Sequence, residues 1–355
     1  MSRVRKLFGQ VFWSHFLVVL TAFAGLQTVF RFLDESKLTT DAYTLTDALF
    51  VAVSALPFRL YQDLPYITLI AVSTGMGSLA QTSQITVLRN AGLSKVRLFA
   101  ILATVMSPLY FLSVAAAEFG VMNAEQMSRT YKQERRGGSA NQLWSRDNAF
   151  IVFVSVGPDG TIERWHELEI EEQRWRLASH LAADEAQFSD RGSIKFLNNS
   201  RVRFEGGNVA TNEELQYETF SSYERSTELV PRVISLQMRD RELLTLTELI
   251  EMFRFSDRHQ LNGAEFERLL VERLSAPLTL VALAFLGFQT AFGSWRSGST
   301  VQRVFVAIGF GVLYKYCAEL TGPTVALLGV SPLLGVAIPL LSVLVLSRYI
   351  ARAPA

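Results

Sequence analysis

Positively charged side chains follow two of the long apolar segments of this chain, and together they have the chemistry of an anion site. They are Arg31 and Lys37 after the first segment, and Arg129, Lys132, Arg135 and Arg136 after the third. Arg129, Lys132 and Arg136 recur at intervals of three and four residues, so they share one face of a helix. Arginine presents a planar fork of N–H donors that suits phosphate oxygens. The pattern predicts either an anion site or basic side chains that anchor helix ends among lipid headgroups.

A second charged pair, Lys315 and Glu319, lies inside an apolar segment. The two residues are four positions apart and therefore share one helical face. If the segment starts at Val304, Lys315 lies about 16 Å along the helix, near the middle of a bilayer. Charges at that depth face a bundle interior or a wet cavity. The pair is predicted either to satisfy itself structurally or to give a substrate cavity positive potential through Lys315.

The loop Leu79–Lys95 has the spacing of a short amphipathic helix between two apolar segments. Ser83 can cap this helix at its N-terminus, and Gly92 can end it in the left-handed conformation. Ile85 and Leu88 belong to one apolar ridge. A helix of this kind either lies on lipid headgroups or docks into a groove on a partner protein.

Motifs of known catalytic chemistry are missing from the sequence. It contains no G-x-x-x-x-G-K-[ST] phosphate-binding loop, no H-E-x-x-H zinc motif and no G-x-S-x-G nucleophile motif. The four histidines are too scattered in the sequence to indicate a metal site. We therefore expect no enzymatic activity, and no metal or cofactor bound by this chain. The polar segments assigned below to the cytosol are too short for an ATPase domain.

The elements that carry these residues are apolar runs of membrane-spanning length. The chain has 355 residues, of which 49% are hydrophobic and 19% charged, and the apolar residues are clustered. Runs of about 20 residues match a hydrocarbon core of ~30 Å. The six predicted spans are Val11–Phe30, Leu64–Ala80 after an interfacial helix Asp47–Phe58, Leu98–Ala117, Leu274–Gly293, Val304–Thr321 and Thr324–Leu346.

The short polar stretches between the spans indicate the orientation. Met1–Gln10, Gln81–Arg97, Ser294–Arg303 and Ser347–Ala355 contain Lys and Arg but no Asp or Glu. Short loops with unopposed positive charge stay in the cytosol, whereas long domains cross the membrane regardless of charge. We therefore expect a multi-pass membrane protein with cytosolic termini and a large block on the opposite side of the membrane.

That block, from Val121 to about Arg273, reads mostly as strands. The predicted strands are Ala149–Val156, Thr161–Ile170, Arg174–Phe188, Ser193–Leu197, Val202–Phe204, Tyr217–Ser221 and Leu229–Leu236. Repeated short strands without intervening helices indicate a sandwich or jelly roll. Phe153, Trp175, Leu177, Phe188 and Phe204 are expected to fill or line it. Two helices should follow, one capped by Thr245 or Thr247 and one by Asn262. With Cys317 as the single cysteine, no intramolecular disulfide is possible.

One stretch has a specific resemblance. Leu64–Phe99 contains P-x-I-x-L-I-A-x-x-x-G-M-G-x-L-A-Q-x-S-Q-I-x-x-L-R-N-A-G-L-S, which resembles the coupling region of the LptF/LptG family of lipopolysaccharide export permeases. Phe32–Glu35, Gln142–Asp147 and Thr321–Pro323 fit the LptG branch better than the LptF branch. The resemblance implies an α-helical six-span membrane protein with an inserted periplasmic β-jelly roll. Its parts would be residues 1–120 with a coupling helix at about 81–95, the jelly roll at 121–260, and residues 261–355.

The resemblance also assigns candidate site residues. Those that would dock a cytosolic ATPase are Ser83, Gln84, Ile85, Leu88, Arg89 and Gly92. The family usually has Glu where this chain has Gln84, which can form a hydrogen bond but not an ion pair. The candidates to contact lipopolysaccharide are Arg31, Asp34, Lys37, Arg129, Lys132, Arg135, Arg136 and Lys315, of which the resemblance itself matches Arg31 and Lys37. Leu38 stands where family members often have a further Lys.

The implied function is that of a permease subunit of an ABC-type exporter, which passes lipopolysaccharide from the outer leaflet of the inner membrane to a periplasmic bridge. The implied partners are an LptF-like paralogue, an LptB-like ATPase dimer that uses the ATP, an LptC-like single-span protein, bridging jelly rolls and lipopolysaccharide, and no nucleic acid. Alternatives are the LptF subunit itself, a mechanotransmission or sensor protein that transports nothing, and a membrane scaffold. A transporter predicts polar residues within spans, and Arg31, Lys315 and Glu319 supply them.

Overall fold

The fold is described from a computed structural model of the chain, in two units that are treated separately. The described residues are 2–136, 141–147, 150–157, 161–171, 176–188, 193–203, 216–259, 261, 263–292 and 299–352. The helical unit comprises Met1–Arg136 and Glu267–Ala355, and the β unit comprises Gly137–Phe266.

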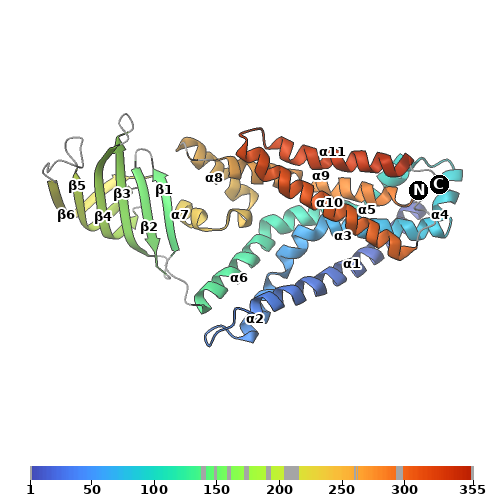
Figure 1. Cartoon of the computed structure of the whole chain (residues 1–355), viewed down its shortest axis with the longest axis horizontal. Helices are drawn as coiled ribbons and strands as arrows, with labels where there is room; N and C mark the ends of the chain where they lie inside the picture. The colour runs from blue at the N-terminus through green and yellow to red at the C-terminus, as the bar shows by residue number, and fades with distance from the viewer. Residues whose placement is uncertain are drawn as a thin grey trace. The chain divides into compact units, whose positions relative to one another are not determined.

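The helical unit is a bundle of long helices with a few short ones at its ends (Figure 1). Its helices are α1 (Ser2–Ser36), α2 (Leu45–Ser54), α3 (Leu56–Gln81), α4 (Gln84–Asn90), α5 (Lys95–Ala116), α6 (Met122–Arg135), α9 (Ala264–Gln289), α10 (Thr300–Leu327) and α11 (Leu333–Arg352). A π-helical turn, Ala117–Val121, joins α5 to α6. Figure 1 shows the start of α1, the end of α11 and α4 at one end of this unit, with α2 and the end of α6 toward the other.

Among the described residues, four helices are long and apolar enough to cross a membrane. They are Ser2–Ser36, Lys95–Arg135, Ala264–Gln289 and Val301–Leu327. Helix α3 falls outside this group, and the structure gives the reason. Every residue from Ile67 to Gly77 is buried, and α3 packs against both α1 and α10. A central helix of this kind faces protein rather than lipid, so it tolerates small and polar residues. The predicted count of six spans stays a prediction.

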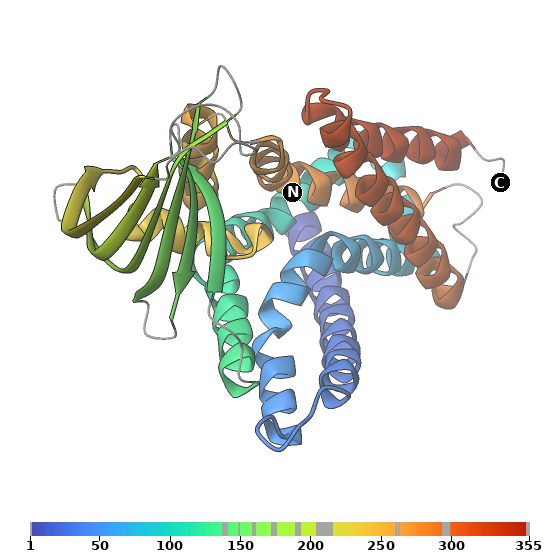
Figure 2. The ribbon, with the colours of Figure 1, turned by 60° about the vertical axis from the view of Figure 1, so that its left-hand side comes forward.

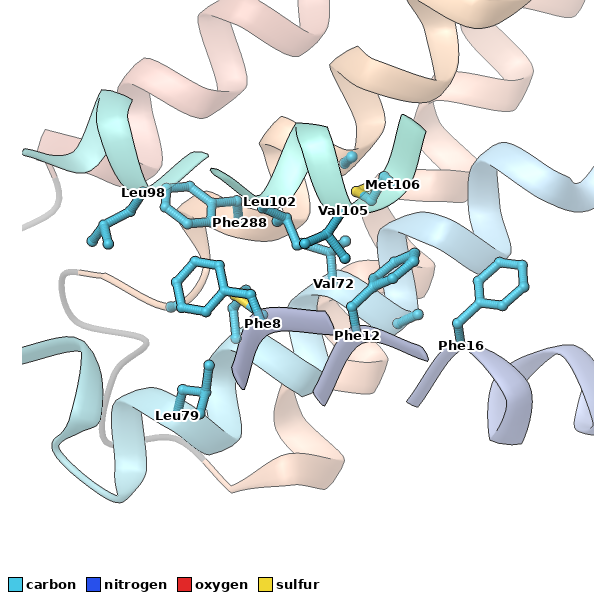
Figure 3. Close-up of a cluster of buried hydrophobic side chains, with 14 of the residues drawn as sticks. Phe8, Phe12, Phe16, Val72, Leu79, Leu98, Leu102, Val105, Met106 and Phe288 are labelled. Atoms are coloured by element: carbon cyan, nitrogen blue, oxygen red, sulfur yellow. The ribbon is translucent and has the colours of Figure 1, made fainter. Parts of the chain in front are cut away.

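Aromatic and aliphatic side chains from α1, α3, α4, α5 and α9 form the main core of the helical unit. Phe8, Phe12 and Phe16 recur every four residues along α1, so they form one stripe that is buried against α3, α5 and α9. Figure 3 shows these rings near Val72, Leu79, Leu98, Leu102, Val105, Met106 and Phe288. The opposite face of α1 is exposed in this chain, which suits contact with lipid or with a second subunit.

Small residues let α9 approach α3 closely. A Cβ placed on Gly287 would lie 2.6 Å from the carbonyl oxygen of Leu69, so only glycine fits there. Beside this contact the hydroxyls of Ser73 and Thr290 are 2.7 Å apart and form a hydrogen bond. Close backbone contact and interhelical hydrogen bonds are the main attractions between helices in a membrane, where the hydrophobic effect gives none.

The boundary predicted between the fifth and sixth spans is wrong by about two turns. Helix α10 continues through Gly322 and Pro323 to Leu327, and α11 begins only at Leu333. Gly322 serves helix packing rather than a turn. A Cβ on Gly335 of α11 would lie 3.2 Å from the Cα of Gly322, and the Thr321 hydroxyl donates to the Gly335 carbonyl at 3.0 Å.

The β unit contains one antiparallel sheet in which the strands follow one another in chain order. The strands are β1 (Asn141–Asp147), β2 (Phe150–Val156), β3 (Ile162–Glu171), β4 (Arg176–Phe188), β5 (Ser193–Arg203) and β6 (Gln216–Ser226). They are followed by α7 (Pro231–Met238), a 3-10 turn Arg241–Leu243 and α8 (Leu246–Arg258). Figure 2 shows that the sheet is strongly curved. The strand-rich block is thus confirmed, and its assignment as a jelly roll stays a prediction.

Two local predictions in this block need correction. The strands predicted at Ser193–Leu197 and Val202–Phe204 are one strand, β5. The strand predicted at Leu229–Leu236 is helix α7, in which Val233, Ile234 and Leu236 are buried. Pro231 occupies the first helical turn, where its missing N–H costs nothing. A proline at this point of the sequence is a signal for the start of a helix, and the strand prediction overlooked it.

Other local predictions have a clear outcome. Strand β1 was not predicted at all. Thr245 caps α8 as predicted and forms a capping box with Glu248. Asn262, Trp175 and Phe204 lie outside the described residues.

Candidate functional site

The basic residues at the ends of α1 and α6 surround a buried acid that the sequence analysis did not single out. Glu35 is only 2% exposed. Its carboxylate lies 3.2 Å from Nη2 of Arg31 and 2.8 Å from Nζ of Lys132, and it accepts a hydrogen bond of 3.1 Å from the hydroxyl of Tyr43. Arg31 precedes Glu35 by one helical turn, whereas Lys132 comes from α6. The cluster therefore joins α1 to α6 through charge.

A second acid of the same region, Asp47, lies in the first turn of α2. It accepts hydrogen bonds from the hydroxyl of Tyr131 at 2.5 Å and from the backbone N–H and hydroxyl of Thr44 at 2.8 and 2.7 Å. These hydrogen bonds lower the pKa of Asp47 to about 2. The guanidinium of Arg135 lies over the Tyr131 ring, 5.5 Å from its centroid. The predicted cation Arg135 therefore lies beside the hydrogen-bonded group formed by Asp47, Thr44 and Tyr131.

The remaining predicted cations differ in their surroundings. Arg129 donates to the fully buried Glu125 at 2.8 Å. Lys37 pairs with Asp34 at 2.9 Å, but both side chains are 72% exposed. Arg136 follows the end of α6 and is exposed. The spacing of Arg31 to Glu35 and of Glu125 to Arg129, four residues in each case, is the sequence signal that predicts such pairing.

The intramembrane pair predicted on α10 is present but loosely held. Nζ of Lys315 lies 3.8 Å from a carboxylate oxygen of Glu319, and both side chains are more than half exposed in this chain. A separate polar contact links α1 to α3, in which the amide of Gln27 donates to the carboxylate of Asp63. Polar groups thus occur on α1, α3 and α10, three of the helices that form the bundle.

Helix α4 forms within the predicted coupling loop, but it has only seven residues. Gly92 adopts the predicted left-handed conformation with φ of 89°. The prediction that Ser83 caps the helix with its side chain is wrong. Ser83 occupies the capping position with φ of 59°, and its side chain makes no capping hydrogen bond. A side chain that caps a helix normally comes from a residue with β-region backbone angles, whereas those of Ser83 are left-handed.

The ridge predicted on α4 faces inward. Ile85 is buried in the main core, and Leu88 packs against the same core. Gln84 and Arg89 are exposed, as is Val87, which is 65% exposed and was not predicted. The outward surface of α4 therefore combines an amide, a cation and an isolated apolar side chain.

A buried cation near the start of α10 was also missed. Arg303 is only 1% exposed, although it belongs to a polar stretch that was predicted to be cytosolic. A Cβ on Gly77 of α3 would lie 2.3 Å from Nη1 of Arg303 and 2.5 Å from its Cδ. Gly77 therefore makes room for the arginine, and this contact positions α10 against the end of α3 that leads to α4.

The interior of the curved sheet holds a further ion cluster. Arg225 of β6 donates to Asp147 of β1 at 2.9 Å and to Glu167 of β3 at 2.7 Å. Thr227 donates to Asp147 at 2.6 Å, and the indole N–H of Trp165 donates to Glu167 at 2.9 Å. Because β1 and β6 are the two outer strands of the sheet, this cluster connects its edges across the curved face.

Predicted interior residues of the sheet divide between its two faces. Phe188 packs against Trp165 on the buried face, with ring centroids 6.3 Å apart. Phe153 lies on the other face and packs against the exposed Trp144 at 4.9 Å and against His166 at 5.8 Å. Among the described residues, no group of three or more His, Cys, Asp or Glu side chains is arranged to hold a metal.

Several membrane-length helices, with a β-sheet unit inserted between them in the sequence, indicate a multi-pass membrane protein. The chain belongs to the lipopolysaccharide export system permease LptF/LptG family, which it matches over residues 6–353. It is 21% identical to the lipopolysaccharide export system permease protein LptG of Escherichia coli K12 over 352 residues, covering 97% of this chain and 96% of that protein. It is 22% identical to LptG of Haemophilus influenzae, covering 96% and 94%.

Proposed function

We propose that this chain is the LptG-like permease subunit of an ABC-type exporter that extracts lipopolysaccharide from the outer leaflet of the inner membrane. The family match over nearly the whole chain carries this proposal, and the LptG relatives in two organisms support the LptG assignment over LptF. The chain itself hydrolyses no ATP in this proposal. A cytosolic ATPase dimer does so, and an LptF-like chain, an LptC-like chain and periplasmic jelly rolls complete the path.

The architecture we propose has six crossings, formed by α1, α3, α5 with α6, α9, α10 and α11. The acid-free stretches near α4 and at both ends of the chain support a cytosolic location for that end of the helical unit. The β unit is then periplasmic and adopts the jelly-roll arrangement of the family. Its outer strands β1 and β6 offer backbone groups with which a neighbouring sheet could pair.

Coupling to the ATPase follows from the way α4 is attached. Only Thr82 and Ser83 separate α4 from α3, and Ile85 fixes the inner side of α4 in the core. A partner that binds the exposed side, which includes Val87, moves α4 and α3 together. Because α3 packs against α1 and α10, its displacement reaches both. In the proposed mechanism this closes a cavity shared with the second permease chain.

The substrate contacts we propose are those predicted from the sequence. At the end of α1 and along α6 they include cations beside Asp34, Glu35 and Glu125, and Lys315 adds positive charge on α10. Phosphate groups are the natural ligands of such clustered Arg and Lys side chains. The exposed face of α1 supports its role as the wall through which a lipid enters.

Copurification tests the proposal. The full-length protein is isolated from native membranes in a mild detergent, and an ATPase subunit, a second permease chain and bound lipopolysaccharide are expected with it. Val87→Asp should reduce recovery of the ATPase by at least about tenfold, because burying an unpaired charge at an interface costs more than 1.4 kcal/mol. The matched control Val87→Thr keeps the shape of the side chain and should retain the ATPase.

The outcomes separate the alternatives. Recovery of lipopolysaccharide and a permease partner with no ATPase, under conditions that preserve complexes, would refute the transporter assignment and favour a sensor. Retention of the ATPase by Val87→Asp would show that α4 is not the docking helix.

A further inference from the structure

Glu35 has an unusual position for a carboxylate in a predicted substrate site. It lies on the last turn of α1, nearly fully buried, between two cations that are themselves candidates to bind an anion. If Arg31 and Lys132 bind phosphate, Glu35 competes with the ligand for both. If Glu35 served only to stabilise the fold, one cation would suffice to balance its charge.

The cluster is one negative charge short. Arg31 and Lys132 carry two positive charges against the single charge of Glu35. Their side chains are 23% and 22% exposed, so both cations lie partly at the surface. In addition, Nε of Arg31 is buried and has no hydrogen-bond partner among the described residues. A buried donor without an acceptor costs stability until an acceptor arrives.

Tyr43 would still hydrogen-bond Glu35 after the ion pairs of Glu35 with Arg31 and Lys132 are broken. Its hydroxyl donates to Glu35, and burial together with the negative charge of Glu35 raises the pKa of Tyr43 above its usual value. The phenol therefore stays protonated and remains a donor. If the Glu35 carboxylate loses its contacts with Arg31 and Lys132, it keeps the hydrogen bond from Tyr43.

We propose that Glu35 is a resident counter-anion that ties α1 to α6 through Arg31 and Lys132 until a phosphate group of the lipid substrate replaces it. The inference rests on the proposed function, since it names how the same site is regulated. The exchange makes binding selective for phosphorylated headgroups and releases the end of α1 when such a lipid arrives.

A phosphate group fits this exchange better than a carboxylate. It offers three acceptor oxygens and up to two negative charges. It can accept from Nε and Nη2 of Arg31 in the bidentate manner that guanidinium favours, while a third oxygen accepts from Lys132. The orphaned Nε–H gains its acceptor, and the surplus positive charge is neutralised. A neutral or singly charged headgroup would achieve only part of this.

Binding measurements on the full-length protein in nanodiscs test the exchange. The probe is bisphosphorylated lipid A, with lipid A lacking both phosphates for comparison. Glu35→Gln should bind the bisphosphorylated probe roughly fivefold more tightly than the wild type, because the internal competitor for Arg31 and Lys132 is lost; a fivefold change corresponds to about 1 kcal/mol. The matched control is Glu134→Gln, which removes the same charge from an exposed position on α6 and should change the affinity less than twofold.

A distance measurement tests the release of α1. Spin labels at Leu33→Cys and Gln133→Cys, both exposed, report the separation of α1 and α6 in a Cys317→Ser background. Bisphosphorylated lipid A should lengthen or broaden this distance in the otherwise wild-type protein. Glu35→Gln should show the longer distance without lipid. Inorganic phosphate at millimolar concentration should have no such effect, and an equal effect would overturn the assignment to a lipid headgroup.

Failure of the inference and failure of the proposed function give different results. If the wild type binds lipid A and Glu35→Gln binds it equally well or less well, with an unchanged distance, the counter-anion role is overturned while the transport proposal stands. If neither protein binds lipid A, the proposed function fails and the inference falls with it.

Discussion

Two buried ion clusters, one in each unit of this protein, have opposite charge balances. In the helical unit, Glu35 lies between Arg31 and Lys132, so the cluster has a surplus of one positive charge. In the β unit, Arg225 lies between Asp147 and Glu167, so the surplus is negative. Both are built around one central group that holds two partners from different elements.

The clusters differ in how far their outer members reach solvent. Asp147 and Glu167 are both buried, and Arg225 is nearly so. Burial opposes the charge of Arg225, but Glu167 and Asp147 outweigh it and raise the pKa of its guanidinium. The cations around Glu35 remain partly exposed. The comparison indicates that the β cluster holds the sheet edges together, whereas the helical cluster can exchange its anion.

The largest expected effect is that of Arg225→Met. It leaves Asp147 and Glu167 buried without their cation, and breaking a buried ion cluster in this way costs about 3–5 kcal/mol. Hydrogen exchange should show loss of protection in β1, β3 and β6. Arg164→Met removes an exposed arginine from β3 and should leave protection unchanged. A nearly neutral Arg225→Met would mean that β1 and β6 are held by backbone pairing alone.

Acidification should loosen the β unit before it loosens the start of α2. Burial and the neighbouring His166 lower the pKa of His180 below its usual value of 6.5. The unfolded chain then binds the proton more readily, so this stabilisation is present above pH 6.5 and is lost as the pH falls through it. Asp47 has a pKa of about 2 against an ordinary 3.8, so its contribution persists until the pH falls below 3.8.

Hydrogen exchange after brief exposure to pH 5 checks this difference. Relative to the intrinsic exchange rate at each pH, β3 and β4 should be less protected at pH 5 than at pH 7.5, while protection at the start of α2 should not change. His180→Gln should remove the difference in β4. Equal loosening of both regions at pH 5 would contradict the assignment of these groups.

The smallest effect on stability is expected at Lys37. Its ion pair with Asp34 is exposed on both sides, and such pairs add little because solvent screens them. Lys37→Gln should leave hydrogen exchange at the end of α1 unchanged but weaken binding of bisphosphorylated lipid A. A clear loss of protection at the end of α1 would contradict the expectation that solvent screens this exposed pair.

The sequence by itself determined the features that arise from local patterns. Apolar runs of membrane-spanning length, the alternation of the strands and the left-handed Gly92 depend on neighbouring residues only, and the structure confirms the strand-rich block and the Gly92 turn. The cap at Thr245 was predicted for the same reason. The motif around α4 indicated the family, which the match over the chain confirms.

Tertiary structure decided what depends on residues distant in the sequence. Lys132 reaches Glu35 across 97 positions, and Arg225 reaches Asp147 across 78. No periodicity encodes such pairs, because they form only when packing brings two elements together. The same reason explains why Ile85 faces the core and why Gly77 accommodates Arg303. The sequence shows the cations that predict an anion site. Only the packing of α1 against α6 shows that Glu35 lies between two of them.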